Sequence, residues 1–354
     1  MTQLDIARLA NVSQATVSRV LSGDDRVEIE LRDRVVQVIQ EHNYQPDVRA
    51  RSLRLKRTGL IGLVIKRPHG GLTDDPFFAA LTAGIMDHLC GKPYHLCVDV
   101  VTDEIAQGGI YDEMLRTRRV DGLILVEAEA LDERITRLQN DKFPFVMIGD
   151  PKNDDIASVD NDNVHCGEIA TRHLIKQGYR RIGILGGPRR INFSNDRIEG
   201  YTNAMSAAGL NPLVWHSDFG FEAARKTALE IFDGPHRPDA MVVLDDFMTF
   251  GVVTAARARY IKVPDHLGLV SFNNTSLCQL LEEGLTSVDL GMARMVELAV
   301  KKLLEIIEEG EATEPKRQIV PAQIIQRGSC NRPVVPPSLE ASPPESVLAV
   351  GGQR

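Results

Sequence analysis

Residues 2 to 22 contain two short amphipathic segments joined by a tight turn, the pattern of a helix-turn-helix. The small Ala7 allows two helices to cross closely, and Asn11 can adopt the left-handed conformation that such a turn requires. Val12 and Val17 are spaced to close a small apolar core between the two segments. The pattern therefore predicts an all-α head at the start of the chain.

The second segment carries the side chains that we expect to contact DNA. Ser13 precedes it and is a favourable N-cap residue. The outer face has short side chains and one arginine, which can donate two hydrogen bonds to guanine in the major groove. The expected base-contacting residues are Gln14, Ala15, Thr16, Ser18 and Arg19. A small surface hairpin of two helices with a polar outer face is the alternative.

The sequence NYQPDVRARSLRLKR at 43–57 resembles the block YxPNxxARxL of the LacI/GalR family of bacterial repressors. In that family the block forms a hinge helix that orders on operator DNA, and its leucine inserts into the minor groove. Such an insertion costs base stacking but bends the duplex and gains phosphate contacts. The resemblance implies that Leu53 is this leucine and that Arg49 and Ala50 also contact DNA. A solvated basic linker is the alternative for these residues.

Four residues of the head and hinge depart from the family pattern. Asn11 replaces the usual turn glycine, and Asp47 replaces an asparagine and so adds a negative charge beside the DNA. Glu28 stands where a serine commonly caps the third helix and touches phosphate, and Leu31 replaces a threonine. Asparagine is tolerated in a left-handed turn, whereas Asp47 predicts weaker DNA binding by the hinge. The changes at Glu28 and Leu31 leave the phosphate contact of the third helix open, and another contact could compensate for it.

From Thr58 onward, short apolar runs rich in β-branched residues alternate with segments of helical length. The rhythm restarts after VDNDN at 159–163, which predicts two similar lobes with parallel sheets. This two-lobed α/β body resembles the periplasmic-binding-protein fold that the family uses to sense its effector. The end of the chain is rich in Pro and Ser and has no period, so we expect a disordered tail.

These patterns divide the chain into four parts. The expected ranges are 1–45 for the helix-turn-helix domain, 46–57 for the hinge helix and linker, 58–329 for the effector-binding and dimerisation body, and 330–354 for the tail. Within the body we expect residues 58–160 and 290–329 to form the first lobe and residues 161–289 to form the second.

The resemblance also implies an effector site in the cleft between the lobes. Arg197, in NDRIEGY, could hold two vicinal hydroxyl groups, and Asp245 and Asn273 follow consecutive strands, where ligands meet open α/β sheets. Many family members carry Asp at the position of Asn273. The residues expected to bind the effector are Phe77, Phe78, Asp150, Arg197, Phe219, Asp245 and Asn273. For Phe219 a role in the core is an equal alternative.

The charge of the chain is divided unevenly. Residues 1–57 carry ten Lys/Arg and eight Asp/Glu, a net charge of +2, whereas the remainder carries 31 and 41, a net charge of −10. We therefore expect only the N-terminal part to bind a polyanion. The expected partners are palindromic operator DNA, a small-molecule effector and a second copy of the chain, with a tetramer left open.

Other classes of function find little support in the sequence. The five cysteines lack paired CxxC spacing, the acidic residues around Asp160 do not have calcium-loop spacing, and no nucleophilic triad is recognisable. We expect no metal, no cofactor and no catalytic activity. No apolar run reaches membrane-spanning length and the first residues are not a leader peptide, so we expect a cytoplasmic protein without a membrane partner.

The expected function is that of a transcriptional repressor released by a small sugar. The strings IGDP, VDNDN and VSFNN are similar to those of the maltose-responsive branch of the family, which favours a maltose-like α-glucoside. Another sugar is an alternative, as is a sugar phosphate held by Lys66 and Arg67. A corepressor-dependent regulator of the same fold and a non-regulatory sugar-binding protein are the remaining alternatives.

Overall fold

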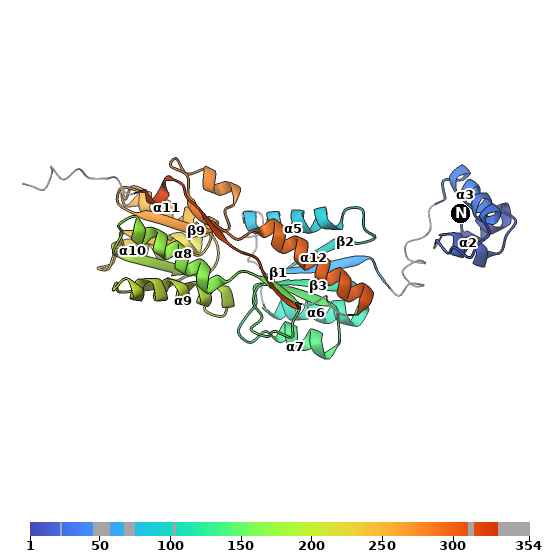
Figure 1. Ribbon diagram of the computed structural model, residues 1–354, viewed down its shortest axis with the longest axis horizontal. Coiled ribbons are helices and arrows are strands. Elements are labelled where there is room, and N and C mark those ends of the chain that lie inside the picture. Colours follow the sequence, from blue (N-terminus) through green and yellow to red (C-terminus); the bar gives the residue numbers. More distant parts are fainter. Residues whose placement is uncertain (22, 45–56, 67–74, 102–103, 311–314, 332–354) are drawn as a thin grey trace, which may run out of the picture.

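The computed structural model consists of a helical head and a two-lobed body (Figure 1). It describes residues 1–21, 23–44, 57–66, 75–101, 104–310 and 315–331.

The head contains the three helices α1 (Gln3–Leu9), α2 (Gln14–Leu21) and α3 (Ile29–Glu41). Asn11 has φ 51° between α1 and α2, which confirms the left-handed turn. The Ser13 hydroxyl accepts a hydrogen bond from Thr16 N at 3.1 Å and so caps α2 as predicted. The small core contains Ile6, Ala7, Ala10, Val17, Val35, Val38 and Tyr44, with Val12 packed against it.

The first lobe is built on a six-stranded parallel sheet in the order β11-β5-β4-β3-β1-β2. Its elements are β1 (Leu60–Lys66), α5 (Pro76–Leu89), β2 (His95–Val101), α6 (Glu104–Thr117), β3 (Gly122–Val126), α7 (Glu133–Asn140), β4 (Phe145–Ile148), β5 (Ser158–Asp160), α12 (Met292–Glu309) and β11 (Arg317–Ile319). The central strand β3 is fully buried, as expected for a parallel sheet covered on both faces.

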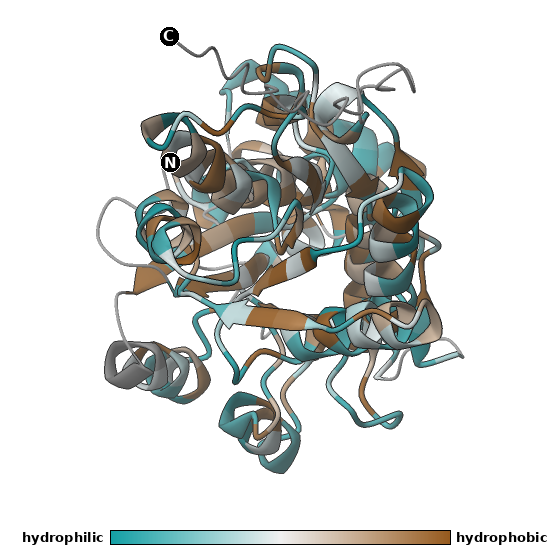
Figure 2. Ribbon diagram, turned by 90° about the vertical axis from the view of Figure 1, so that its left-hand side faces the viewer, coloured by the Kyte–Doolittle hydropathy of each residue, from teal (hydrophilic) through white to brown (hydrophobic). Residues whose placement is uncertain are grey.

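The second lobe repeats this plan with the strand order β12-β10-β9-β8-β6-β7, in which only β12 is antiparallel to its neighbour. Its elements are α8 (Asn163–Lys176), β6 (Ile182–Gly186), α9 (Asn192–Ala207), β7 (Leu213–His216), α10 (Phe221–Asp233), β8 (Ala240–Val243), α11 (Asp246–Ala258), β9 (Gly268–Phe272), η1 (Ser276–Gln279), β10 (Thr286–Asp289), β12 (Gln323–Ile325) and η2 (Gly328–Cys330). Apolar strands lie inside and helices with polar outer faces surround them (Figure 2).

Residues 290–329 do not all return to the first lobe, which corrects the expected lobe boundary. Helix α12 packs on α5 and β11 extends the first sheet, but β12 pairs with β10 in the second sheet. The dark red segment that runs from one lobe to the other in Figure 1 is this crossing.

The boundary of the expected tail is also corrected. The Ser329 hydroxyl donates a hydrogen bond to Leu269 O at 2.7 Å, and Cys330 is completely buried. The second lobe therefore extends beyond residue 329, because η2 covers the edge of its core. Residues 332–354 of the expected tail lie outside the described residues.

Helices α8 and α9 approach each other closely at two glycines. A side chain at Gly167 would collide with the carbonyl oxygen of Arg197, and one at Gly200 would collide with that of Val164. This close approach packs the start of α8 against the middle of α9, next to the cleft residues Asn163 and Arg197.

None of the helices in the described ranges is long and apolar enough to cross a membrane.

Candidate functional site

The structure places the expected base-contacting residues on one short helix. Gln14, Ala15 and Arg19 of α2 are exposed, whereas Thr16 and Ser18 are partly buried. Val17 points into the core of the head, so α2 has a packed inner face and a mainly polar outer face. The other three residues expected to contact DNA, Arg49, Ala50 and Leu53, lie outside the described residues.

A cleft between the lobes is lined by residues of both. Its wall combines apolar and aromatic side chains with a few polar groups, as the walls of small-molecule sites do. Five of the seven residues expected to bind the effector line it: Phe77, Arg197, Phe219, Asp245 and Asn273. Because they come from α5, from α9 and from the ends of β7, β8 and β9, the fold brings together residues far apart in sequence.

Arg197 is the best-anchored of these residues. Its Nε donates a hydrogen bond of 2.9 Å to Asn163 Oδ1, and its Nη1 donates one of 2.9 Å to Leu244 O. The guanidinium also lies over the rings of Phe193 and Phe272, at 4.9 and 4.3 Å from their centroids. Burial lowers the pKa of Arg197, as desolvation disfavours a charge. The side chain is thus held in one orientation before any ligand binds.

Aromatic rings form the apolar part of the cleft. Phe77 lines it from the first lobe, and Phe193 and Phe219 line it from the second. The Phe193 and Phe219 rings stack with their centroids 6.2 Å apart. Flat apolar surfaces beside hydrogen-bonding groups suit a ligand that has both apolar faces and hydroxyl groups.

Polar groups follow the strands at the cleft. The Asp245 carboxylate accepts a hydrogen bond from Met248 N at 2.7 Å and so caps α11. Asn273 follows β9 with φ 96°, a conformation that few residues other than glycine adopt. Asp160, at the end of β5, accepts a hydrogen bond from Asn163 Nδ2 at 3.0 Å. Burial raises the pKa of Asp160 to about 7, and the neighbouring Asp150 carboxylate adds to the shift.

Two residues expected in the cleft are not on its wall. Phe78 is buried in the core of the first lobe, since it lies on the inner face of α5 while its neighbour Phe77 lines the cleft. Asp150 is held in an ion-pair network with Arg317 at 2.7 Å and Lys152 at 3.3 Å. Its carboxylate therefore binds basic side chains of the protein and does not line the cleft.

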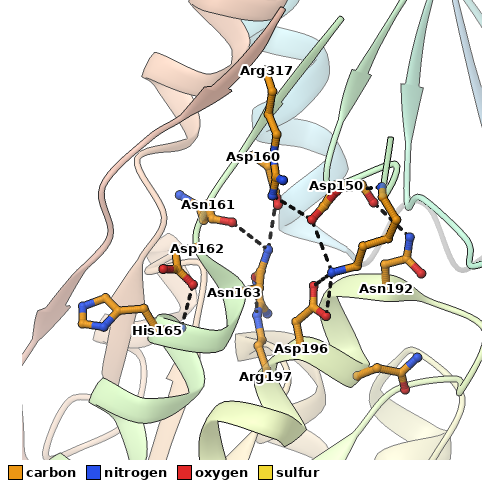
Figure 3. A network of polar contacts seen from close by, with 12 residues as sticks. Asp150, Asp160, Asn161, Asp162, Asn163, His165, Asn192, Asp196, Arg197 and Arg317 are labelled. Atoms are coloured by element: carbon orange, nitrogen blue, oxygen red, sulfur yellow. Dashed lines mark hydrogen bonds and ion pairs between the residues drawn. The ribbon is translucent and has the colours of Figure 1, made fainter. Parts of the chain in front are cut away.

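The Asp150 network connects the two lobes (Figure 3). Lys152 of the first lobe also pairs with Asp196 of α9, with Nζ 2.8 Å from Oδ2. Asn192 Nδ2 donates a hydrogen bond to Asp150 O at 2.9 Å across the same gap. Both contacts depend on the present spacing of the lobes, so opening the cleft would break them.

Several residues of the cleft wall were not predicted from the sequence. Asp75 lies two residues before the expected Phe77, and the Asp160–Asn163 segment was not expected to bind the effector. The position of VDNDN at the end of a strand was a signal for the site. The polar and aromatic wall residues that were missed are Asp75, Glu127, Asp160, Asn161, Asn163 and Phe193.

No group of three or more His, Cys, Asp or Glu side chains suited to a metal ion occurs in the part of the chain that the structure describes.

A helix-turn-helix head joined to a two-lobed α/β sensor defines a class of ligand-responsive transcriptional regulators. The chain belongs to the LacI family of this class. The model for bacterial regulatory proteins of the lacI family matches residues 2–47, and the model for the periplasmic binding protein-like domain matches residues 171–330. These matches confirm the predicted fold class and the DNA-binding function.

Relatives match over nearly the whole chain. Catabolite control protein A of Staphylococcus epidermidis is 30% identical over 334 residues, which are 93% of this chain and 99% of the relative. The transcriptional regulator MalR of Streptococcus pneumoniae is 29% identical over 333 residues, 92% of this chain and 99% of the relative. These relatives are regulators, which agrees with the expectation that the chain is not an enzyme.

Solved structures show the same architecture. The complex of the transcriptional regulator CelR with cellobiose has a TM-score of 0.71 and 27% identity, and the match covers 93% of this chain and 99% of that one. The Lac repressor dimer bound to operator and the anti-inducer ONPF has a TM-score of 0.80 with 21% identity over 93% of this chain and 99% of that one. The latter likeness supports the fold.

Proposed function

We propose that the chain is a homodimeric repressor that binds palindromic operator DNA and is released by a neutral sugar in the interlobe cleft. In this proposal the outer face of α2 reads the major groove, and Arg49, Ala50 and Leu53 of the hinge segment 46–57 add contacts at the operator centre. The body senses the effector.

The observation that carries the effector proposal is the anchored guanidinium of Arg197 between aromatic rings at the cleft. Arginine can donate several hydrogen bonds in a fixed plane, which suits neighbouring hydroxyl groups. Asp245 and Asn273 provide further polar groups at the strand ends, and Phe77 and Phe219 provide apolar surface. Together these groups match the alternating apolar faces and hydroxyl edges of a sugar ring.

The charge of the cleft favours a neutral sugar over a sugar phosphate. Four carboxyl groups and one guanidinium line the cleft: Asp75, Glu127, Asp160, Asp245 and Arg197. Of the two basic residues suggested for a phosphate, Lys66 pairs with Glu129 at 3.4 Å, and Arg67 lies outside the described residues. Bringing a phosphate dianion near these carboxylates is costly in a low-dielectric cleft.

A maltose-like α-glucoside is the sugar that we favour. The support comes from the similarity to MalR and from the VSFNN segment, in which Asn273 replaces a charged residue. The structure described as a CelR–cellobiose complex indicates that a relative takes a disaccharide in the same fold. Cellobiose is therefore the natural comparison ligand.

Thermal unfolding of the purified chain with a panel of sugars tests the effector. A ligand at about 100 times its dissociation constant adds roughly 2.7 kcal/mol to stability and so raises Tm. We expect maltose to raise Tm more than cellobiose, glucose or maltose 6′-phosphate. Equal Tm values with every sugar would contradict a sugar effector.

Operator binding with and without the active sugar tests the direction of control. The operator is first recovered from a random duplex library by the ligand-free chain. We expect the sugar to weaken binding, since a ligand shifts the chain toward the arrangement that it binds better. Stronger binding with the sugar would instead support the corepressor alternative, and no recovered duplex would contradict the regulator proposal itself.

A further inference from the structure

The folded head has an unusual charge for a DNA-binding module. Residues 1–44 contain five Lys/Arg and seven Asp/Glu, so the net charge of this part is −2. Glu28, the N-cap residue of α3, makes no side-chain cap hydrogen bond. It also lacks the hydroxyl group with which a serine at this position could bind a phosphate. Because neutralisation of phosphates supplies much of the affinity of DNA-binding proteins, positive charge must come from outside the folded head. The segment 45–57 carries five Lys/Arg and one Asp, and cations of the body can add to them.

A basic groove supplies such charge on the first lobe, although the body as a whole is strongly acidic. It lies where the chain enters the lobe, at the C-terminal ends of α6, α7 and α12. Its five cationic residues are Arg57, Arg116, Arg118, Arg137 and Lys142. We call this set the entry groove.

The carboxylates of the entry groove are largely occupied by other groups. Asp121 accepts hydrogen bonds from the backbone N–H groups of Thr58 and Gly59, both at 2.7 Å. Asp112 pairs with Arg137. The third carboxylate, Asp141, is exposed to solvent. With five cations and three carboxylates, the groove carries a net charge of +2.

Three of the five cations have no carboxylate partner among the described residues. The side chains of Arg116, Arg118 and Lys142 are exposed, and among the described residues none of them makes a hydrogen bond or an ion pair. Cations at helix C-terminal ends complement the helix dipole, which accounts for part of their placement. That interaction leaves their N–H donors directed to solvent and available to a phosphate.

The groove is tied directly to the segment that leads to the head. Arg57, the first described residue after segment 45–56, donates a hydrogen bond of 2.7 Å from Nη2 to Ile307 O. The backbone of the next two residues is fixed by Asp121. The groove thus lies at the end of the lobe nearest in sequence to the DNA-binding part.

We propose that the entry groove is a further DNA contact, in addition to the head and the hinge segment, at which Arg116, Arg118 and Lys142 neutralise backbone phosphates of the operator. This inference rests on the proposed operator binding and adds a contact from the body. The contact is independent of base sequence, because it involves phosphates alone.

The test compares two triple variants that remove the same charge. The groove variant is Arg116→Gln, Arg118→Asn and Lys142→Asn, in which Asn suits the left-handed backbone of the last two positions (φ 48° and 50°). The control variant, Arg181→Gln, Lys226→Gln and Arg257→Gln, changes exposed cations of the second lobe. The probe is the duplex that the wild-type chain recovers from a random library.

Affinity is measured by fluorescence anisotropy from about 50 to about 200 mM KCl, where the slope of log K against log salt is roughly −0.9 for each phosphate contact. We expect the groove variant to bind roughly tenfold more weakly at the lowest salt, with a slope less steep by about one unit per lost contact. The control variant should keep the wild-type slope.

Three results would overturn the proposal. The groove variant could keep the wild-type affinity and slope. It could lose affinity equally at every salt concentration together with a lower Tm, which indicates a structural role. Inorganic phosphate or pyrophosphate could raise the Tm of the wild-type chain but not of the groove variant while the slope for DNA stays unchanged, which indicates a small-anion site.

The single change Lys142→Asn repeats the measurement if the triple variant does not fold. Failure of the wild-type chain to recover any duplex contradicts operator binding instead.

Discussion

Asp160 places a carboxyl group where water is nearly excluded. Its pKa of about 7 means that the folded chain holds a proton that the unfolded chain releases near the ordinary value of 3.8. Stability from this group is therefore greatest at low pH and is lost as pH rises toward 7. Burial makes the charged form of Asp160 unfavourable, and the residue lies on the cleft wall. A ligand hydroxyl group could therefore donate a hydrogen bond to its carboxylate and stabilise that form.

Asp160→Asn should remove this dependence on pH. The amide keeps an oxygen that can accept the hydrogen bond from Asn163 but carries no charge. We expect the variant to gain stability relative to the wild type as pH rises from about 4 to about 7, with a constant difference above that. Urea unfolding at several pH values measures the difference, and a difference that does not change with pH would contradict the assignment.

Arg197→Lys should separate sugar binding from DNA binding. Lysine keeps the positive charge but loses the planar set of donors that Asn163 and Leu244 hold in place. A lost hydrogen bond to a charged group corresponds to roughly tenfold to hundredfold weaker binding. Calorimetric titration with maltose should show this loss, whereas ligand-free operator affinity should stay near the wild-type value. Unchanged sugar affinity would remove Arg197 from the site.

Single residues also show how far sequence can predict a site. Asp245 and Asn273 were predictable because the ends of parallel strands meet at one edge of a sheet. Arg197, which lies on α9, was predicted from the family resemblance of NDRIEGY. Phe77 and Phe78 were not distinguishable, because adjacent helix positions face different directions and only packing decides which one is buried. The ion-pair partners of Asp150 could not be predicted either, since Arg317 approaches it from a distant part of the chain.

Helices α8 and α9 pack closely because each has a glycine at their contact, Gly167 and Gly200. Gly200 lies three residues after Arg197 on α9. One turn of this helix therefore carries both the arginine that lines the cleft and the glycine that sets the distance to α8. The order of strands and helices in each lobe was predictable from apolar runs. The transfer of β12 to the second sheet was not, because one short strand-like segment gives no sign that it changes lobe.

Gly200→Ala should therefore be strongly destabilising. The added methyl group would collide with backbone atoms of α8, which cannot move aside as a flexible side chain can. We expect a loss of at least about 2 kcal/mol in the free energy of unfolding, measured with urea. Gly108→Ala in α6 is the matched control, because no atom lies near the added group, and it should be neutral or slightly stabilising. Equal effects of the two changes would contradict this packing argument.

At the scale of the whole molecule, the two lobes are joined by three chain crossings and by ion pairs across the gap. Asn161 Nδ2 donates hydrogen bonds to Leu290 O at 2.9 Å and to Val320 O at 2.8 Å, so one side chain joins all three crossings. Away from this point, the pair between Lys152 and Asp196 favours the present spacing of the lobes.

Lys152→Met should weaken the present arrangement of the lobes. Because the lysine is about half exposed, the pair contributes modestly, and we expect a few-fold loss of sugar affinity by calorimetric titration. Arg172→Met is the matched control, since it removes a pair with Glu168 that lies within α8. A loss of the same size in the control would show that the interlobe position of Lys152 does not matter.

The late crossing of β12 has a practical consequence for building hybrid sensors. Exchanging residues 161–289 with a relative does not transplant the whole second lobe, because the host still supplies the edge strand β12 and the buried residues Ser329 and Cys330 of η2. The transplanted sheet would then pair with a β12 strand from another protein, and its core would be covered by an η2 segment with which it did not evolve. A graft that also carries residues 323–331 moves the lobe as a complete folding unit, so effector specificity passes between relatives as two separate pieces of sequence.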